Sequence, residues 1–421
     1  MKFQAPRGTY DILPKEMNKW YYIEKIIKKY VKLFNYREIR LPIFEYKDLF
    51  QRSVGDDSDI VEKEMYVFED KNERLFALRP EGTASVARSY IENSMISSKR
   101  DPKKIFYYGP MFRYSRPQKG RYRQFYQFGI EYIGDESAYA DAEIITMGWK
   151  ILQEAQVPDV SLEINSVGCK KCRKDYHKKL QEFLFARENK FCPNCQRRMK
   201  TNPLRVFDCK NYVCQEQLEN APQMLDNLCE DCEKHFDEVQ ENLKKLNVDY
   251  EINPRIVRGL DYYTRTAFEY KINYLGAQDA LGGGGRYDGL IEYLGGKNTP
   301  AVGLSMGMER IILALEEAGV EFPQINTLDV FIIPMDKKYD DKAIEIMNKL
   351  HDSEISAQIA DANTSMGSNF KFCDRNNVKF AIVIGENEIK SEEYAVKNIS
   401  KHKQESVHLD KLTDYINSKI E

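Results

Sequence analysis

Residues 106–134 consist of two apolar and aromatic runs on either side of a short, strongly basic loop. The runs have the composition of β-strands, and Pro117 and Gly120 favour a turn between them, so the segment predicts an antiparallel hairpin. The loop from Arg113 to Arg123 contains five basic residues and no acidic one. Arginines at a hairpin tip can bind phosphate oxygens, and the alternative is a solvated basic turn. The basic residues are Arg113, Arg116, Lys119, Arg121 and Arg123.

The sequence around this hairpin predicts further elements of a mixed fold. Apolar residues at helical spacing predict an amphipathic helix over 15–34, and a strand is expected to start near Glu38. Because proline cannot donate a backbone hydrogen bond, Pro42 indicates that this strand lies at an edge, a bend or a subunit seam. Residues 141–155 are predicted to be helical, and a strand over 301–307 should lead into a helix over 308–318 that ends at Gly319.

The pattern changes from about residue 328 to short apolar runs separated by segments of helical length. This alternation predicts a small second α/β domain with a largely parallel sheet. Residues 328–421 contain 13 basic and 17 acidic side chains, so their charge gives no indication of RNA binding. We therefore expect one domain over 1–325 and a second over 326–421.

Length and composition indicate a soluble protein of several domains, because 421 residues exceed what one hydrophobic core usually organises. No uncharged run approaches the roughly 18 residues of a membrane helix, and the first ten residues lack an apolar signal core. The sequence thus predicts a cytoplasmic protein without a membrane segment. A net charge of −3 argues against a protein that coats nucleic acid but allows local basic surfaces.

Eight of the nine cysteines lie in a short region, within an expected insertion over 168–238. Reduced thiols in the cytoplasm and two-residue spacing within pairs favour structural zinc over disulfides. Four pairs predict two four-thiolate sites, but the spacing does not determine which pairs combine. His177 or His235 could replace a thiolate, and a single site with spare buried thiols is the alternative; Cys373 is expected in the core of the second domain. The predicted ligands are Cys169, Cys172, Cys192, Cys195, Cys209, Cys214, Cys229 and Cys232.

Residues 168–210, the first part of this insertion, contain 13 basic and four acidic side chains. This excess would suit contact with RNA phosphates, and a solvated face partly neutralised by thiolates is an equally good interpretation.

Several common chemistries are excluded by the absence of their motifs. There is no GxxxxGK[ST] segment, and the glycines at 282–285 do not extend to GxGxxG because Tyr287 and Asp288 follow. All five histidines lie in the cysteine-rich insertion or the second domain, which argues against histidine base catalysis near the hairpin. The sequence remains compatible with a reaction in which a group attacks phosphorus and arginine side chains stabilise the negative charge electrostatically.

Several segments resemble the motifs of one enzyme family. GPMFRY with the basic loop and QFYQFGIE is similar to motif 2 of class II aminoacyl-tRNA synthetases, AVGLSMGMER is similar to motif 3, and REIRLPIFE to motif 1. LRPEGT at 78–83, RGLDYYTRTAFE at 258–269 and GGGGRYDGL at 282–290 resemble segments peculiar to histidyl-tRNA synthetases, and PRGTYDILP fits their amino terminus. The resemblance covers nearly the whole chain. It departs at Gly282, where the family often has cysteine, and in the fully paired cysteine insertion, so the metal prediction rests on spacing alone.

The resemblance implies an α+β fold, with the antiparallel class II sheet backed by helices and a carboxy-terminal α/β anticodon-binding domain. It implies a homodimer with a seam around motif 1, and ATP-dependent ligation of L-histidine to tRNA(His) through a histidyl-adenylate, with release of AMP and diphosphate. Magnesium should accompany the departing pyrophosphate. The alternatives are a non-catalytic, synthetase-like regulatory subunit of ATP phosphoribosyltransferase, which lacks the terminal domain, and a synthetase for another amino acid, against which RGLDYY and GGGRYDGL argue.

The resemblance also implies roles for individual residues. Arg113 and Arg258 would be catalytic, with Arg113 on the α-phosphate of ATP, and Arg310 would cover the adenine. Arg116 or Gln118 would contact the extra 5′ guanosine typical of histidine tRNA. ATP would be bound by Arg113, Arg121, Arg258 and Arg310; histidine by Glu81, Gly82, Thr83, Gln127, Glu131, Tyr262 and Tyr263, with Glu131 and Tyr263 on the imidazole; and tRNA by Arg116, Gln118 and Arg123.

Overall fold

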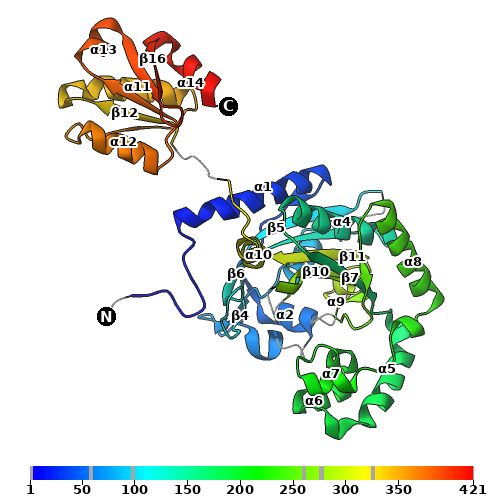
Figure 1. The fold of residues 1–421 in the computed structure, drawn as a ribbon. Coiled ribbons are helices and arrows are strands. Elements are labelled where there is room, and N and C mark those ends of the chain that lie inside the picture. The colour runs from blue at the N-terminus through cyan, green and yellow to red at the C-terminus, as the bar shows by residue number, and fades with distance from the viewer. Residues whose placement is uncertain are drawn as a thin grey trace. The chain divides into compact units, whose positions relative to one another are not determined.

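The computed structural model describes residues 3–55, 60–95, 100–257, 262–274, 279–323 and 328–420. The chain divides into two compact units, residues 1–322 and 323–421. Figure 1 shows the first unit as a large sheet with helices against it and the second as a smaller sheet with helices of its own. In the described ranges no helix is both long and apolar enough to cross a membrane.

The first unit is built on an eight-stranded sheet with the order β1-β5-β6-β11-β10-β9-β7-β8. All neighbours from β5 to β7 are antiparallel, whereas β1 and β8 pair in parallel at the two edges. The antiparallel sheet confirms the predicted fold class. The strands are β1 (Arg37–Glu38), β5 (Lys103–Phe112), β6 (Gln124–Ile133), β7 (Val160–Ser166), β8 (Glu251–Ile252), β9 (Thr264–Ile272), β10 (Ala280–Arg286) and β11 (Ala301–Gly307).

The predicted hairpin is confirmed, because β5 and β6 pair along their whole length from Lys103↔Ile133 to Phe112↔Gln124. The predicted strand through Pro42 is wrong in extent. β1 ends at Glu38 and the next strand starts at Phe44, so Pro42 lies in the connection between them. A proline lacks the N–H that a strand ladder needs, and the carbonyl of Pro42 instead accepts a hydrogen bond of 3.2 Å from Arg79.

Four helices and the large sheet form the main core of the first unit. Two of them were predicted within three residues, the amphipathic amino-terminal helix and the helix after the hairpin. The helix after β11 also follows the prediction, and Gly319 beyond its end has a φ of +70°, which glycine adopts without strain. The helices are α1 (Met17–Leu33), α4 (Ala138–Glu154), α8 (Glu230–Lys245) and α10 (Met308–Glu317).

Smaller elements flank this core. A three-stranded sheet with the order β2-β4-β3 contains β2 (Phe44–Tyr46), β3 (Val67–Glu69) and β4 (Leu75–Leu78), and the nearby helices are α2 (Lys47–Val54), α3 (Thr83–Glu92) and α9 (Leu290–Tyr293). The cysteine-rich insertion contributes α5 (Lys170–Phe185), α6 (Pro193–Thr201) and α7 (Tyr212–Gln217), which pack around a separate core that includes all eight cysteines.

The second unit has a five-stranded sheet with the order β13-β12-β14-β15-β16. The three predicted strands are parallel, and the remaining two form an antiparallel hairpin that was not predicted from sequence. Tyr394 and Val396 are buried in β15, but the other residues of this edge hairpin are mostly polar, so its hydrophobic pattern is weak. The elements are β12 (Val330–Pro334), β13 (Ala357–Ile359), β14 (Phe380–Ile384), β15 (Glu393–Asn398), β16 (Lys403–His408), α11 (Asp340–Asp352), α12 (Met366–Arg375), α13 (Glu386–Ser391) and α14 (Leu412–Ile420).

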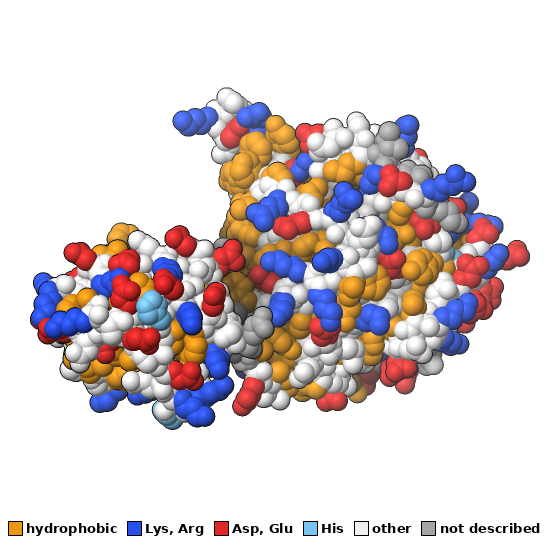
Figure 2. Space-filling model, turned by 90° about the horizontal axis from the view of Figure 1, so that it is seen from above, with side chains coloured by type: hydrophobic (Ala, Val, Ile, Leu, Met, Phe, Trp, Pro, Cys, Tyr) orange, Lys and Arg blue, Asp and Glu red, His pale blue; other side chains and the backbone are white. Residues whose placement is uncertain are grey.

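Two further expectations for the second unit can be checked. Cys373 is fully buried in its core, as predicted. On the face of the second unit that Figure 2 shows, the smaller body at the left, both Lys and Arg and Asp and Glu side chains are present, in line with the balanced composition.

Candidate active site

A cleft of about 340 Å³ opens in the first unit beside the hairpin loop and the strands β6, β9, β10 and β11. Its walls come from segments far apart in the sequence, because the antiparallel order of the sheet places these strands side by side. Eight of the residues predicted to bind ligands line it, namely Glu81, Thr83, Arg113, Arg121, Gln127, Tyr262, Tyr263 and Arg310.

Three arginines make one part of the cleft strongly basic. Arg113 donates from Nε to the carbonyl of Pro80 at 2.9 Å, and its guanidinium lies 5.3 Å from the ring centroid of Phe125. Arg310 donates to the carbonyl of Ala280, and Arg121 pairs with Glu64 at 2.7 Å. Burial lowers the pKa of Arg310, and the nearby charges of Arg113 and Arg121 lower it further. Such a cluster is suited to a ligand with several negative charges.

Glu81 provides an acidic group in the same cleft. Its carboxylate accepts hydrogen bonds from the backbone N–H groups of Thr83 at 2.6 Å and Ala84 at 2.8 Å, which are in the first turn of α3. Burial raises the pKa of Glu81, although both backbone bonds act in the opposite direction. Gln127 lies on strand β6 of the hairpin and also lines the cleft; its Oε1 is buried without a hydrogen-bond partner among the described residues. The cleft thus offers a carboxylate and an unsatisfied acceptor oxygen.

Glu131 lies beneath the cleft and is completely buried. Its carboxyl group accepts one hydrogen bond of 2.8 Å from the hydroxyl of Thr83 and one of 2.6 Å from the hydroxyl of Tyr287. Burial raises the pKa of Glu131 to about 8, and the two hydroxyl bonds only partly offset this rise. At neutral pH the group therefore carries a proton in most molecules. Thr83 connects Glu131 to the cleft, because Thr83 itself lines it.

Gly82 contributes space for an aromatic ring. A methyl group at position 82 would lie 2.3 Å from the ring of Tyr107, and one at Gly129 would lie 2.2 Å from the same ring on β5. Tyr107 is buried between these two glycines, so larger residues at either position would displace it. The structure thus gives Gly82 a packing function beside the cleft.

Tyr262 and Tyr263 form an aromatic wall at the start of β9. Their ring centroids are 4.7 Å apart, and the ring of Tyr262 lies 5.7 Å from that of Tyr287. Arg258, predicted to be catalytic and to bind ATP, lies outside the described residues.

The three residues predicted to bind tRNA differ in their surroundings. Arg116 and Gln118 are exposed on the hairpin loop, where the backbones of Gln118 and Arg121 exchange two hydrogen bonds. Arg123 is half-buried, because its guanidinium lies over the ring of Tyr114 at 3.8 Å and donates to the carbonyl of Ser115. Arg116 and Gln118 are thus available to a large partner, whereas Arg123 packs against the base of its own loop.

Glu309 was missed from sequence although it also lines the cleft. Both of its carboxylate oxygens accept a hydrogen bond from the backbone N–H of Tyr126, at 2.9 and 3.0 Å. Burial raises the pKa of Glu309 to about 7. It thereby ties the start of α10, and with it Arg310, to strand β6. The only sequence signal for it was an acidic residue in the first turn of a helix.

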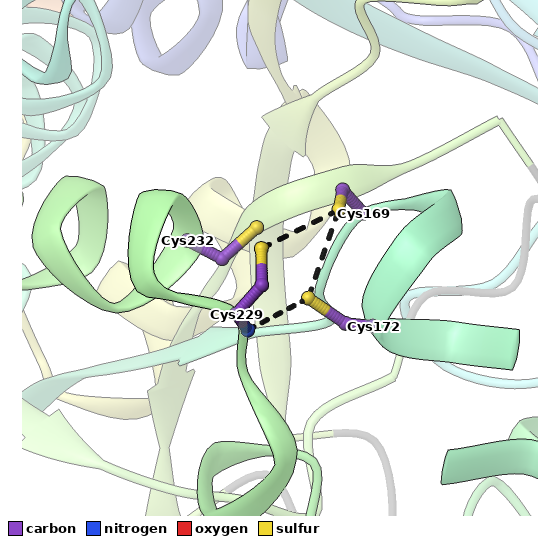
Figure 3. A group of neighbouring side chains, drawn as sticks. All are labelled: Cys169, Cys172, Cys229 and Cys232. Atoms are coloured by element: carbon purple, nitrogen blue, oxygen red, sulfur yellow. Dashed lines mark hydrogen bonds between the residues drawn. The ribbon is translucent and has the colours of Figure 1, made fainter. Parts of the chain in front are cut away.

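The eight predicted cysteine ligands lie in two groups of four. One group contains Cys169, Cys172, Cys229 and Cys232, and Figure 3 shows their sulfur atoms facing one another between the amino-terminal ends of α5 and α8. The other group contains Cys192, Cys195, Cys209 and Cys214. Within each group the four sulfur atoms lie within 4.8 Å of one another. Neither His177 nor His235 belongs to a group, and Nε2 of His235 instead lies 3.5 Å from a carboxylate oxygen of Asp141.

Comparisons with known proteins agree along the whole chain. Residues 8–311 match the family model described as Histidyl-tRNA synthetase, and residues 329–419 match the model of an Anticodon binding domain. The chain is 46% identical to the histidine–tRNA ligase of Halothermothrix orenii, over 98% of this chain and 99% of that protein.

Solved structures give the same picture. The crystal structure of apo histidyl-tRNA synthetase from S. aureus superposes with a TM-score of 0.84 at 39% identity, over 99% of this chain and 100% of that one. A chain from Bacillus halodurans C, described as an ATP phosphoribosyltransferase regulatory subunit/histidyl-tRNA synthetase, superposes with a TM-score of 0.63 at 21% identity, over 91% of this chain and 98% of that one. This last similarity shows a common fold alone.

Proposed function

Because the chain belongs to the histidyl-tRNA synthetase family, it is a class II enzyme that ligates L-histidine to tRNA(His) with ATP, and we propose that histidyl-adenylate forms in the cleft lined by Glu81 and Arg113. The main support for this location is that Arg113 and Glu81 line the same cleft. A polyanion such as ATP and the ammonium group of an amino acid could therefore bind next to each other.

ATP occupies the basic part in this proposal. Arg113 holds the α-phosphate, Arg310 covers the adenine, and Arg121 and Arg258 provide further positive charge. Negative charge spreads over the phosphate oxygens as the histidine carboxylate attacks, and fixed guanidinium groups stabilise it without reorganisation. Magnesium suits the carboxylates of Glu269 and Glu309, which line the cleft near Arg310, and would neutralise charge on the departing pyrophosphate.

Histidine occupies the part of the cleft near Glu81. The carboxylate of Glu81 and the unsatisfied Oε1 of Gln127 suit its ammonium group, with Thr83 and Gly82 beside them. Tyr263 and Glu131 recognise the imidazole, and Tyr262 packs behind Tyr263. A carboxyl group with a pKa near 8 can donate or accept a hydrogen bond at neutral pH, which matches a ring that has one donor and one acceptor nitrogen.

The test is histidine-dependent exchange of pyrophosphate into ATP, without tRNA and with proline and threonine as controls. We expect exchange with histidine alone in the wild type, and a loss of at least about 100-fold in Arg113→Ala, as for removal of a transition-state contact. Lys28→Ala, at an exposed site on α1, provides the matched charge control. Absence of exchange with every amino acid would favour the regulatory-subunit alternative.

Zinc fits both cysteine groups, and we assign a structural ion to each. A tetrahedral ion with Zn–S bonds of about 2.3 Å requires sulfur atoms about 3.8 Å apart. The distances from Sγ of Cys169 to those of Cys172 and Cys229 are 3.6 and 3.8 Å, and Cys192 and Cys209 are 3.9 Å apart. Four thiolates leave no open position, so zinc would hold the insertion over 168–238 together without joining the reaction.

We also propose that the protein is a homodimer. The three-stranded sheet β2-β4-β3 exposes a set of large apolar side chains that a homodimer would bury; they are Phe44, Tyr46, Val67, Phe68 and Leu75.

The hairpin loop with Arg116 and Gln118 would contact the acceptor end of tRNA(His). The second domain, over 326–421, would bind the anticodon, and the catalytic domain would span 1–325. Reduced thiols at zinc fit the cytoplasm.

A further inference from the structure

Backbone hydrogen bonds join the segment that precedes the first cysteine group to the start of β9, directly after Tyr262 and Tyr263. Strands β7 and β9 pair as far as Ser166↔Thr266. Beyond this point, Val167 donates to the carbonyl of Arg265 at 2.7 Å, and Arg265 donates back to the carbonyl of Gly168 at 3.0 Å. Arg265 has a φ of +52°, so the strand bends here towards the residue that precedes Cys169.

Arg173 adds a side-chain connection between the same two segments. It lies in the first turn of α5, directly after Cys172. Its Nε donates to the carbonyl of Val167 at 3.0 Å, and its second guanidinium nitrogen donates to the carbonyl of Tyr263. The guanidinium therefore bridges the segment before Cys169 and the backbone of a residue whose side chain lines the cleft.

The position of Arg173 depends in turn on the four sulfur atoms. Cys169 is the residue before α5 and Cys172 lies in its first turn, while Cys229 and Cys232 have the same relation to α8. Figure 3 shows both helix ends meeting at this group. Sγ of Cys172 also accepts a hydrogen bond of 3.1 Å from the backbone N–H of Cys229. Without an ion the four thiols would no longer be bound to one centre, so the first turn of α5 could shift, and the guanidinium of Arg173 with it.

We propose that Arg173 is a positioning residue for histidine recognition, which links the cysteine group at the start of α5 to the backbone of Tyr263. This inference rests on the proposed function, because it assumes that Tyr263 contacts the histidine substrate. Arg173 acts through Tyr263 and is not itself a catalytic residue. The consequence is that the affinity for histidine depends on zinc at Cys169, Cys172, Cys229 and Cys232. Arg113 and Arg121 on the hairpin loop are held instead by the carbonyl of Pro80 and the carboxylate of Glu64.

The experiment compares Arg173→Ala with Lys174→Ala, which removes an exposed positive charge from the neighbouring position. We expect about tenfold weaker histidine binding by calorimetry for Arg173→Ala, as for loss of one charged donor, and no change for Lys174→Ala. The KM for histidine should rise by a similar factor in pyrophosphate exchange, while kcat and the KM for ATP stay within about twofold. The histidine affinity of Arg173→Lys, which can still donate to one carbonyl, should lie between those of Arg173→Ala and Lys174→Ala.

Metal removal provides the second measurement. Chelation should weaken histidine binding by the wild type and have a smaller effect on Arg173→Ala, because the connection is already broken there. If Arg173→Ala loses zinc, the experiment uses Arg173→Met in its place, because methionine keeps the packing of the arginine's aliphatic chain but has no hydrogen-bond donor.

The proposal is overturned if an Arg173 variant without a donor keeps both zinc ions and wild-type histidine affinity, or if zinc-free wild type binds histidine normally. A wild-type protein that does not bind histidine at all would refute the proposed function instead.

Discussion

Gly303 on β11 stands directly opposite Glu131 on β6, and the absence of a side chain at Gly303 leaves the space that the Glu131 carboxylate occupies. A methyl group at position 303 would lie 1.7 Å from Oε2 of Glu131. The same oxygen accepts the hydrogen bond from Tyr287. One backbone position thus determines whether a buried carboxyl group can lie beneath the cleft.

We expect Gly303→Ala to displace the Glu131 carboxyl and to lower the free energy of unfolding by about 1–3 kcal/mol, as overpacked cores do. Urea denaturation measures this change, and calorimetry should show weaker histidine binding. Gly289→Ala is the matched control, because a methyl group there meets nothing within 4 Å. Equal losses in both variants would contradict the proposed steric cause.

The raised pKa of Glu131 predicts a dependence of stability on pH. The pKa is about 8 in the folded protein and near 4.5 when exposed, so the folded state holds one more proton between these values. This group's contribution to stability is therefore fully present below about pH 4.5 and is lost as the pH rises to 8, at up to about 1.4 kcal/mol per pH unit. Glu131→Gln should remove this slope. Parallel unfolding profiles for wild type and variant from pH 5 to 8 would rule the linkage out.

Single serine substitutions should separate the two metal sites. We expect Cys172→Ser to reduce the zinc content from two ions per chain to one, and Cys195→Ser to do the same through the other group, because each removes one of four thiolates. Cys373→Ser, in the core of the second unit, should retain both ions. Elemental analysis of the purified proteins measures this directly. If Cys172→Ser or Cys195→Ser still contains two zinc ions per chain, the assignment of zinc to the corresponding cysteine group is excluded.

The exposed loop residues should affect the tRNA step alone. We predict that Arg116→Ala or Gln118→Ala reduces the preference for tRNA(His) over the same tRNA without its extra 5′ guanosine, by about 1–3 kcal/mol for one lost base contact. The measurement is the ratio of kcat/KM for the two tRNAs in aminoacylation. Lys119→Ala, which removes a charge from the same loop, is the control. Unchanged discrimination in both variants would remove base recognition from this loop.

Much of the first unit followed from local patterns. The hairpin over 106–134, the amino-terminal helix and the strand and helix over 301–318 were predicted because apolar periodicity and turn residues act over a few neighbouring positions. Pro42 shows the limit of this approach. It correctly indicated that the strand here lies at a sheet edge, but Pro42 itself lies beyond the end of β1, in a connection that accepts a hydrogen bond from the distant residue Arg79.

The sequence by itself determined which residues are ligand candidates. The spacing of the cysteine pairs and the basic composition of the loop that contains Arg113 are local properties, and Arg310 was identified through the resemblance of its segment to a family motif. Tertiary structure alone decided that Cys169 and Cys172 join Cys229 and Cys232, that Glu131 is buried enough to have a pKa near 8, and that Arg173 reaches Tyr263. Each of these features depends on contacts between segments that are more than 45 residues apart in the sequence, such as Cys172 with Cys229, Thr83 with Glu131, and Arg173 with Tyr263. Burial and long-range contact arise only when the whole chain packs, and so no local pattern could reveal them.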